Sequence, residues 1–169
     1  QDITGSLRAT WHIDEEMSAF GGLSKGFRAP NLTDLDGATD RGSSSTPAFG
    51  NPDLDPETSY TVEAGWRYQQ HKDELAVSIF YTRIDDLIQT VYPSGGGPGS
   101  TENAESADLQ GFEFSWNYGI PSDWLNNGDG RLAVIGSFSY VDTEIEVPQS
   151  DGSTLKEPLS RANRVYGIL

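Results

Sequence analysis

In Thr61-Val62-Glu63-Ala64-Gly65-Trp66-Arg67-Tyr68, apolar side chains alternate with polar ones or glycine. Because successive side chains of a β-strand point to opposite faces of a sheet, this stretch predicts a strand with one apolar and one polar face. The same alternation recurs along the chain, less clearly in one segment. The other expected strands are 6–13, 17–25, 75–82, 111–118, 132–140 and one that begins near Arg161. No stretch has a convincing helical period, so the sequence predicts an all-β fold of about seven antiparallel strands.

The links between these strands alternate in length. Short and long links follow one another in strict order, which predicts an up-and-down meander with short turns at one end and long loops at the other. Transmembrane β-barrels are built in this way, with short periplasmic turns and longer extracellular loops. The short links are 14–16, 71–73 and 119–130, and the long links are 26–58, 93–102 and 148–159.

The tryptophans gather at the end with short links, where three lie on the apolar face and one lies inside a link. Trp prefers the membrane–water interface, which accommodates both its apolar ring and its polar N–H group. Tyrosines lie toward the opposite end, where a second aromatic girdle is expected. The tryptophans are Trp11, Trp66, Trp116 and Trp124, and the tyrosines are Tyr60, Tyr92 and Tyr140. A soluble β-sandwich would share the alternation, but it would not explain the loop asymmetry or the clustered tryptophans.

Composition narrows the possible functions. The 169 residues include 26 acidic and 11 basic side chains, for a formal net charge of −15, which does not supply a nucleic-acid surface. The chain has no cysteine, so disulfides, cysteine-ligated metals and thiol nucleophiles are excluded. Seven strands would leave open edges in lipid, and bacterial barrels have an even strand number. We therefore expect either a part of a longer protein or a strand count that is wrong by one.

Several motifs stand at the ends of the expected strands and keep a fixed order along the chain. The first, 22–32, reads GLSKGFRAPNL, and 50–59 reads GNPDLDPETS, followed by Glu-Ala-Gly at 63–65. Later come FYTRIDDLI at 80–88, Asn103-Ala104, and Gly-Phe-Glu at 111–113. Together these motifs resemble the barrel of TonB-dependent outer-membrane receptors. The residues that carry the first two motifs are Phe27, Arg28, Ala29, Pro30, Asn51, Pro52, Leu54, Pro56 and Glu57.

The resemblance implies a 22-stranded barrel, occluded by an N-terminal plug, in the outer membrane of a Gram-negative bacterium. Residues 1–169 would then form about seven of these strands, and the plug and the TonB box would lie outside the chain. The implied function is active uptake of a scarce ligand across the outer membrane, driven by the TonB complex. A ferric siderophore or similar metal chelate is the expected cargo. Receptors of the same family for haem, cobalamin or carbohydrate, a passive porin, and a soluble β-sandwich binding module remain as alternatives.

The prolines of the motifs fix φ and lack an N–H donor, so Pro30 and Pro52 should stop strand pairing at the borders of the longest loop. Arg28 has two possible roles. It could pair with a carboxylate such as Asp53 or Glu57 and hold the two ends of the loop together, or it could simply snorkel at the membrane rim.

The loop at 26–58 is also the best candidate for ligand contact. Its charged residues proposed for this role are Asp34, Asp36, Asp40 and Arg41. Haem receptors carry a histidine between the two motifs, but residues 31–50 contain none. His12 and His71 lie near the short links, where a solvated structural role is expected.

No catalytic or cofactor site is expected. The glycine-rich stretch 94–99 is not followed by the Lys-Ser/Thr of a phosphate loop, and 123–130 lacks calcium-loop spacing. Asp85-Asp86 and the pair Glu144 and Glu146 are better explained as a solvated acidic rim than as catalytic carboxylates. No G-x-S-x-G elbow holds a serine nucleophile.

Overall fold

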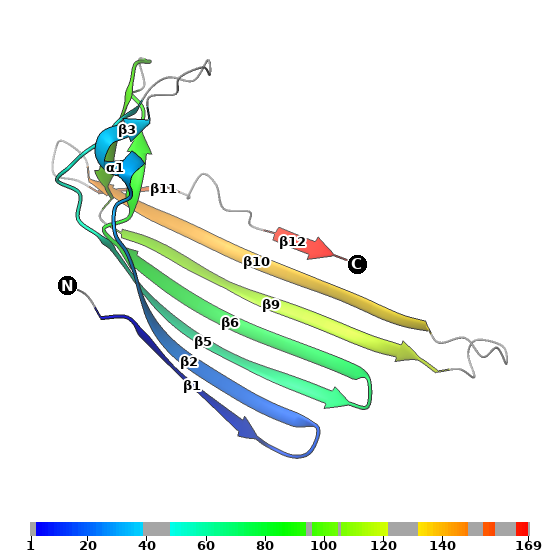
Figure 1. Ribbon diagram of the computed structural model, residues 1–169. Helices are drawn as coiled ribbons and strands as arrows, with labels where there is room; N and C mark the ends of the chain where they lie inside the picture. The colour runs from blue at the N-terminus through cyan, green and yellow to red at the C-terminus, as the bar shows by residue number, and fades with distance from the viewer. Residues whose placement is uncertain are drawn as a thin grey trace.

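A computed structural model describes residues 3–38, 48–93, 96–104, 106–121, 132–148, 154–157 and 165–168. Six long strands form one curved antiparallel sheet in which each strand pairs with its neighbours along the chain (Figure 1). They are β1 (Gly5–His12), β2 (Met17–Arg28), β5 (Glu57–Gln70), β6 (Asp73–Asp85), β9 (Ser106–Ile120) and β10 (Leu132–Pro148). The expected meander is confirmed.

Two short strands, β11 (Thr154–Glu157) and β12 (Val165–Ile168), pair with different parts of β10. The strand expected near Arg161 corresponds to β12. The long strands extend beyond the expected ranges into the predicted loops; β5, for example, begins at Glu57. None of the helices in the described ranges is long and apolar enough to span a membrane.

The short links form as predicted where the structure describes them. Asp14 accepts hydrogen bonds from the backbone N–H groups of Glu16 (2.8 Å) and Met17 (2.7 Å), which closes the β1–β2 turn. The β5–β6 turn consists of His71 and Lys72, and His71 has a φ of 56°. The third link on this side, expected at 119–130 and longer than the other two, lies outside the described residues apart from its first positions.

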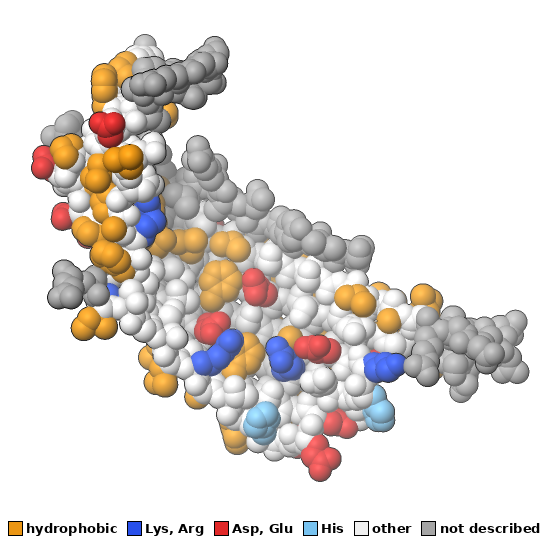
Figure 2. Space-filling view, in the orientation of Figure 1, with side chains coloured by type: hydrophobic (Ala, Val, Ile, Leu, Met, Phe, Trp, Pro, Cys, Tyr) orange, Lys and Arg blue, Asp and Glu red, His pale blue; other side chains and the backbone are white. Residues whose placement is uncertain are grey.

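The two faces of the sheet differ as the alternation predicts. One face carries Leu7, Trp11, Val62 and Phe112, which are all exposed. We call this the outward face, and the opposite face the inner face. Side chains from β1 to β10 border a common hollow on the inner face, and acidic and basic side chains gather at its centre (Figure 2).

The apolar residues of the outward face form a band that slants across the sheet. Strand register places Leu7 of β1 in the same row as Asp142 of β10. In β10 the outward apolar residues begin at Tyr140, two residues closer to the short-turn end than Asp142, and continue to Leu132. Tilted strands in a barrel require such a slant, because each strand is inclined to the membrane normal.

The tryptophans confirm the position of one edge of this band. Trp11, Ala19 and Trp66 are successive partners across β1, β2 and β5. The same row reaches Phe114 in β9, and Trp116 lies two residues nearer to the short turns. Trp124 lies outside the described residues.

The long loops contain structure that the sequence did not indicate. A helix, α1 (Leu32–Asp36), follows β2, and a second sheet combines strands from two loops. Its order is β3–β4–β8–β7, with β4 and β8 parallel. The strands are β3 (Gly37–Ala38), β4 (Ala48–Phe49), β7 (Ile88–Val91) and β8 (Gly99–Asn103). We call α1 and this sheet the crown. The crown stands beyond the loop-side end of the large sheet (Figure 1).

A small core lies where the crown joins the large sheet. Ala104, Ala107 and Ile145 are buried there, and Ile84 and Leu87 pack against them. The described part of the chain has few other buried apolar residues, as expected for one curved sheet whose outward face contacts lipid.

Candidate functional site

The two sequence motifs meet at the base of the crown because Arg28 and Glu57 are direct partners in the β2–β5 register. Nε of Arg28 donates to Oε2 of Glu57 at 2.8 Å, and Nη2 donates to Oε1 at 2.6 Å. This is a bidentate pair, the geometry in which Arg binds carboxylates most strongly. Of the two roles considered for Arg28, the structure shows the ion pair, made with Glu57 and not with Asp53.

Arg28 also holds the crown helix. Its Nη1 donates to Oδ2 of Asp34 at 3.0 Å, and the same oxygen accepts from the backbone N–H of Asn31 at 3.0 Å. The Asn31 side chain in turn accepts from the N–H of Asp34, which completes a capping box at the start of α1. The backbone N–H of Asn51 donates to the carbonyl of Asp34 at 2.9 Å. Asp34 is thus occupied in organising the loop.

Glu57 reaches a third segment of the chain. Its Oε1 accepts from the backbone N–H of Ile88 in β7 at 2.9 Å, so one carboxylate connects β2, β5 and β7. The side chain of Glu57 is only 12% exposed and that of Asp34 18%, whereas Arg28 is 43% exposed. Two largely shielded carboxylates therefore depend on one half-exposed guanidinium.

Asn103 connects two further segments, the turn before β5 and the end of β6, and its sequence motif did not predict these contacts. Its amide accepts from the N–H of Asp55 at 2.9 Å and donates to the carbonyl of Asp55 at 3.0 Å. It also donates to the carbonyl of Asp86 at 2.6 Å, and Asp86 has a φ of 58°. The Asn-Ala motif at 103–104 was the available signal, but its partners lie 17 and 48 residues away.

The other candidate residues are placed as follows. The side chain of Phe27 is 42% exposed, Leu54 is buried, and Asp36 is exposed at the end of α1. The side chain of Asn51 accepts from the N–H of Asp53 at 2.9 Å in the turn before β5. Ala29, Pro52 and Pro56 are exposed, and Pro30 is half-buried between β2 and α1. Asp40 and Arg41 lie outside the described residues.

The acidic pair Glu144 and Glu146 contacts one cation. Nζ of Lys156 lies 2.6 Å from Glu144 and 3.0 Å from Glu146, and both carboxylates raise the pKa of Lys156 above its ordinary value. Glu146 also accepts from the hydroxyl of Ser106 at 3.1 Å. These contacts join β11 to β10.

The inner face carries its own charges. Arg8 lies 3.2 Å from Glu63 and stacks over the ring of Phe20, and Arg67 lies 3.4 Å from Glu74.

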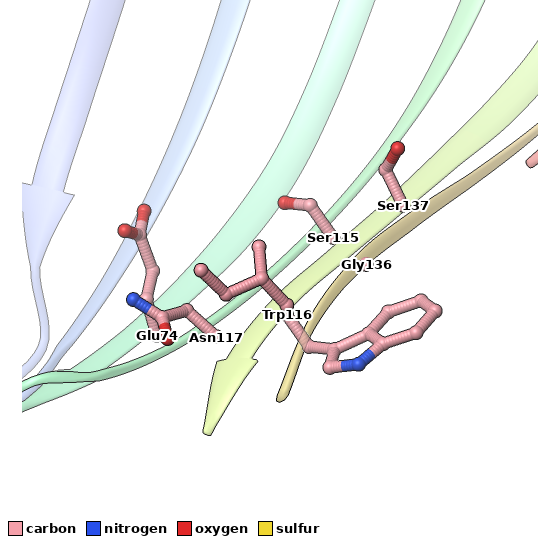
Figure 3. Close-up of a pocket in the computed structure, with 7 residues that line it drawn as sticks. Glu74, Ser115, Trp116, Asn117, Gly136 and Ser137 are labelled. Carbon is pink, nitrogen blue, oxygen red and sulfur yellow. The ribbon is translucent and has the colours of Figure 1, made fainter. Parts of the chain in front are cut away.

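A hollow beside Glu74 is bordered by small polar side chains (Figure 3). Ser115, Asn117 and Ser137 line it, and Trp116 points away to the opposite side of the sheet (Figure 3). Within the described ranges, no group of three or more acidic or histidine side chains is placed to hold a metal ion.

Comparisons with known proteins assign the chain to a family. The family described as "TonB dependent receptor-like, beta-barrel" matches residues 1–169. The iron-regulated outer membrane virulence protein of Vibrio cholerae serotype O1 strain O395 is 40% identical over 162 residues, which covers 88% of this chain and 23% of that protein, and that of strain N16961 is 28% identical over the same length. The vitamin B12 transporter BtuB of Vibrio vulnificus is 32% identical over 111 residues, covering 62% of this chain and 17% of that protein.

A solved structure shows the same fold. The siderophore receptor PirA from Pseudomonas aeruginosa matches with a TM-score of 0.65 at 18% identity, over 97% of this chain and 34% of that one. The chain therefore spans only a fraction of the length of the relatives it matches. Sequence, register and fold agree that this chain is an outer-membrane β-barrel segment that belongs to the TonB-dependent receptor family.

Proposed function

We propose that the protein containing this chain takes up a scarce ligand across the outer membrane, and that the ligand is a ferric siderophore or similar metal chelate. The observation that carries the proposal is the match of the whole chain to the receptor family, with a relative named for its iron regulation at 40% identity. The relative of solved structure that is named a siderophore receptor supports the same cargo.

The proposal includes parts outside the chain. Residues 1–169 would be one part of a 22-stranded barrel domain whose plug and remaining strands lie elsewhere in the protein. The TonB complex would be the partner that drives transport, acting through the N-terminal parts. Crown loops would face the cell exterior, and the inner face would face the plug.

Within the crown, we assign the candidate residues to two roles. The motif residues around Arg28 and Glu57 shape the loop, and so does Asp34, because its carboxylate is bonded to Arg28 and Asn31. Asp36 is exposed and remains a candidate for ligand contact, together with Asp40 and Arg41.

Cobalamin is the second candidate cargo, because a relative at 32% identity is named a vitamin B12 transporter. Haem is disfavoured, because residues 31–50 contain no histidine to ligate iron.

A deletion strain lacking the complete gene, with the gene restored on a plasmid, separates these cargoes. Accumulation of radiolabelled iron from a panel of ferric siderophores under iron limitation should fall in the deletion strain and recover with the plasmid. Uptake of radiolabelled cobalamin in the same strains should not change. If the deletion strain lost only cobalamin uptake, cobalamin would replace the siderophore as the proposed cargo. Unchanged uptake of every iron source would refute the proposal of a ferric siderophore. A protonophore should abolish uptake by a TonB-driven receptor but not passage through a passive porin.

A further inference from the structure

The crown sheet has one packed face and one open face. Phe49 of β4 pairs with Gly37 on one side and with Ser100 of β8 on the other, and Val91 of β7 follows in the same row. The side chain of Phe49 is 65% exposed, whereas the preceding residue, Ala48, points to the opposite face and is buried. We call the face that carries Phe49 the open crown face.

Small neighbours leave the ring of Phe49 accessible from both sides. Gly37 has no side chain, and at its φ of 89° a Cβ would meet the carbonyl oxygen of Ala48 at 2.6 Å, so glycine is required there. Ser100, on the other side, carries only a short hydroxymethyl group. An exposed aromatic ring between small residues offers a flat surface on which an apolar part of a ligand can pack.

Two carboxylates lie beside this ring. Asp36 precedes Gly37 at the end of α1, and Glu102 lies two residues beyond Ser100 on the same face of β8. Among the residues that the structure describes, neither carboxylate has an ion pair or a side-chain hydrogen bond. Hydrophobic and acidic side chains are both exposed on the crown (Figure 2). The open crown face thus combines apolar surface with negative charge.

The two crown loops are strongly acidic as a whole. Residues 29–56 contain five acidic side chains and one basic one, and residues 86–105 contain three acidic and no basic side chains. Arg28, at the base of the crown, already shares its charge with Glu57 and Asp34. Carboxylates around a binding surface repel anions and accept uncharged or cationic ligands. Charge complementarity therefore favours a ligand without net negative charge.

We propose that the open crown face contacts the cargo and that the cargo is a ferric trishydroxamate. Singly charged hydroxamates neutralise iron(III) in a tris complex, whereas doubly charged catecholates leave that complex trianionic. The alkyl linkers between the hydroxamate groups supply apolar surface for Phe49, and the hydroxyl of Ser100 can donate to a ligand oxygen. This inference rests on the proposed uptake of a ferric siderophore, and adds the chemical class of the chelate and the surface that it contacts.

Equilibrium dialysis of the purified full-length receptor against chelates of radiolabelled iron tests the surface. The probes are an uncharged ferric trishydroxamate and a ferric triscatecholate. We expect the trishydroxamate to bind more tightly, and Phe49→Ala to weaken its binding about tenfold, the factor that an aromatic contact contributes. Phe49→Tyr keeps the ring and should bind as the wild type does. Tyr118→Ala is the matched control, because it removes an exposed aromatic side chain near the short-turn end of β9 and should change nothing.

A second pair of variants tests the charge. Asp36→Asn combined with Glu102→Gln should leave trishydroxamate binding unchanged and strengthen triscatecholate binding about fivefold, because each removed carboxylate repels a trianion through screened water. Glu15→Gln is the control for this variant, since it removes an exposed carboxylate in the β1–β2 turn, at the opposite end of the sheet.

The outcomes separate this inference from the proposed function. Tighter binding of the triscatecholate, or trishydroxamate binding that Phe49→Ala leaves unchanged, overturns the inference while uptake of a ferric siderophore stands. The same loss in Phe49→Tyr as in Phe49→Ala also overturns it, because the ring would then not be the contact. Triscatecholate binding that the double charge variant leaves unchanged overturns the electrostatic argument for the trishydroxamate. Binding of neither ferric chelate overturns the proposed function together with this inference.

Discussion

Arg28→Ala should loosen the crown while leaving the barrel wall intact. The substitution removes three charge-assisted hydrogen bonds, two to Glu57 and one to Asp34. Both carboxylates would keep backbone N–H partners, at Ile88 and Asn31, but would lose the guanidinium of Arg28. The crown would then open more often, since the link between β2, α1 and β7 passes through this cluster.

The size of the effect follows from the exposure of the partners. A hydrogen bond to a charged group contributes about 1.5–3 kcal/mol in a protected site. Arg28 is 43% exposed, and solvent-exposed pairs contribute about 1 kcal/mol or less, so the three bonds together should contribute about 1–3 kcal/mol. With 1.4 kcal/mol for each factor of ten, local opening should become roughly 5 to 150 times more frequent.

Hydrogen–deuterium exchange of the full-length receptor measures this opening directly. Peptides from 31–57 and 86–104 should exchange faster in Arg28→Ala, and peptides from the centres of β6 and β9 should not change. Arg28→Lys should give an intermediate effect, because an ammonium group cannot form the bidentate pair. Arg67→Gln is the control, because it removes an exposed inner-face pair with Glu74 and leaves the crown untouched. Unchanged exchange in the crown, or faster exchange throughout the barrel, would refute the proposed role of Arg28 in holding the crown.

Three further substitutions test other parts of the structure. Asn103→Ala removes three hydrogen bonds, two to Asp55 and one to Asp86, and should speed exchange in both crown loops by up to about tenfold, since exposed hydrogen bonds contribute about 1 kcal/mol in all. Gly65→Ala should destabilise the barrel by about 1–3 kcal/mol in thermal unfolding, because a Cβ there meets the ring of Phe20, whereas Gly5→Ala has open space and should be neutral. His71→Gly should raise the free energy of unfolding by up to about 1 kcal/mol, because a positive φ disfavours side chains in the β5–β6 turn.

Most of the large sheet could be predicted because its signal is local. Alternation in 61–68 decides which side chains face lipid, and a two-residue link such as His71-Lys72 permits only an antiparallel neighbour. The sequence of the crown contains no such local alternation or short link. Its strands β3 and β4 have two residues each, too short for any period, and β4 pairs in parallel with β8 from another loop. Pairing of that kind depends on how two loops meet in space.

The spacing of the motifs shows where sequence reasoning reaches its limit. Arg28 and Glu57 are 29 residues apart, and the prediction that the loop ends are tied together required only that β2 and β5 be antiparallel neighbours. The choice between Asp53 and Glu57 required the register, which places Glu57 directly opposite Arg28 and leaves Asp53 in the preceding turn.

The role of Asp34 required still more, because a carboxylate in a loop looks the same in sequence whether it binds a ligand or caps a helix. Only the position of α1 shows that Oδ2 of Asp34 already accepts hydrogen bonds from Arg28 and Asn31. A charged loop residue is therefore a stronger candidate for ligand contact when, like Asp36, it is exposed at the end of the helix.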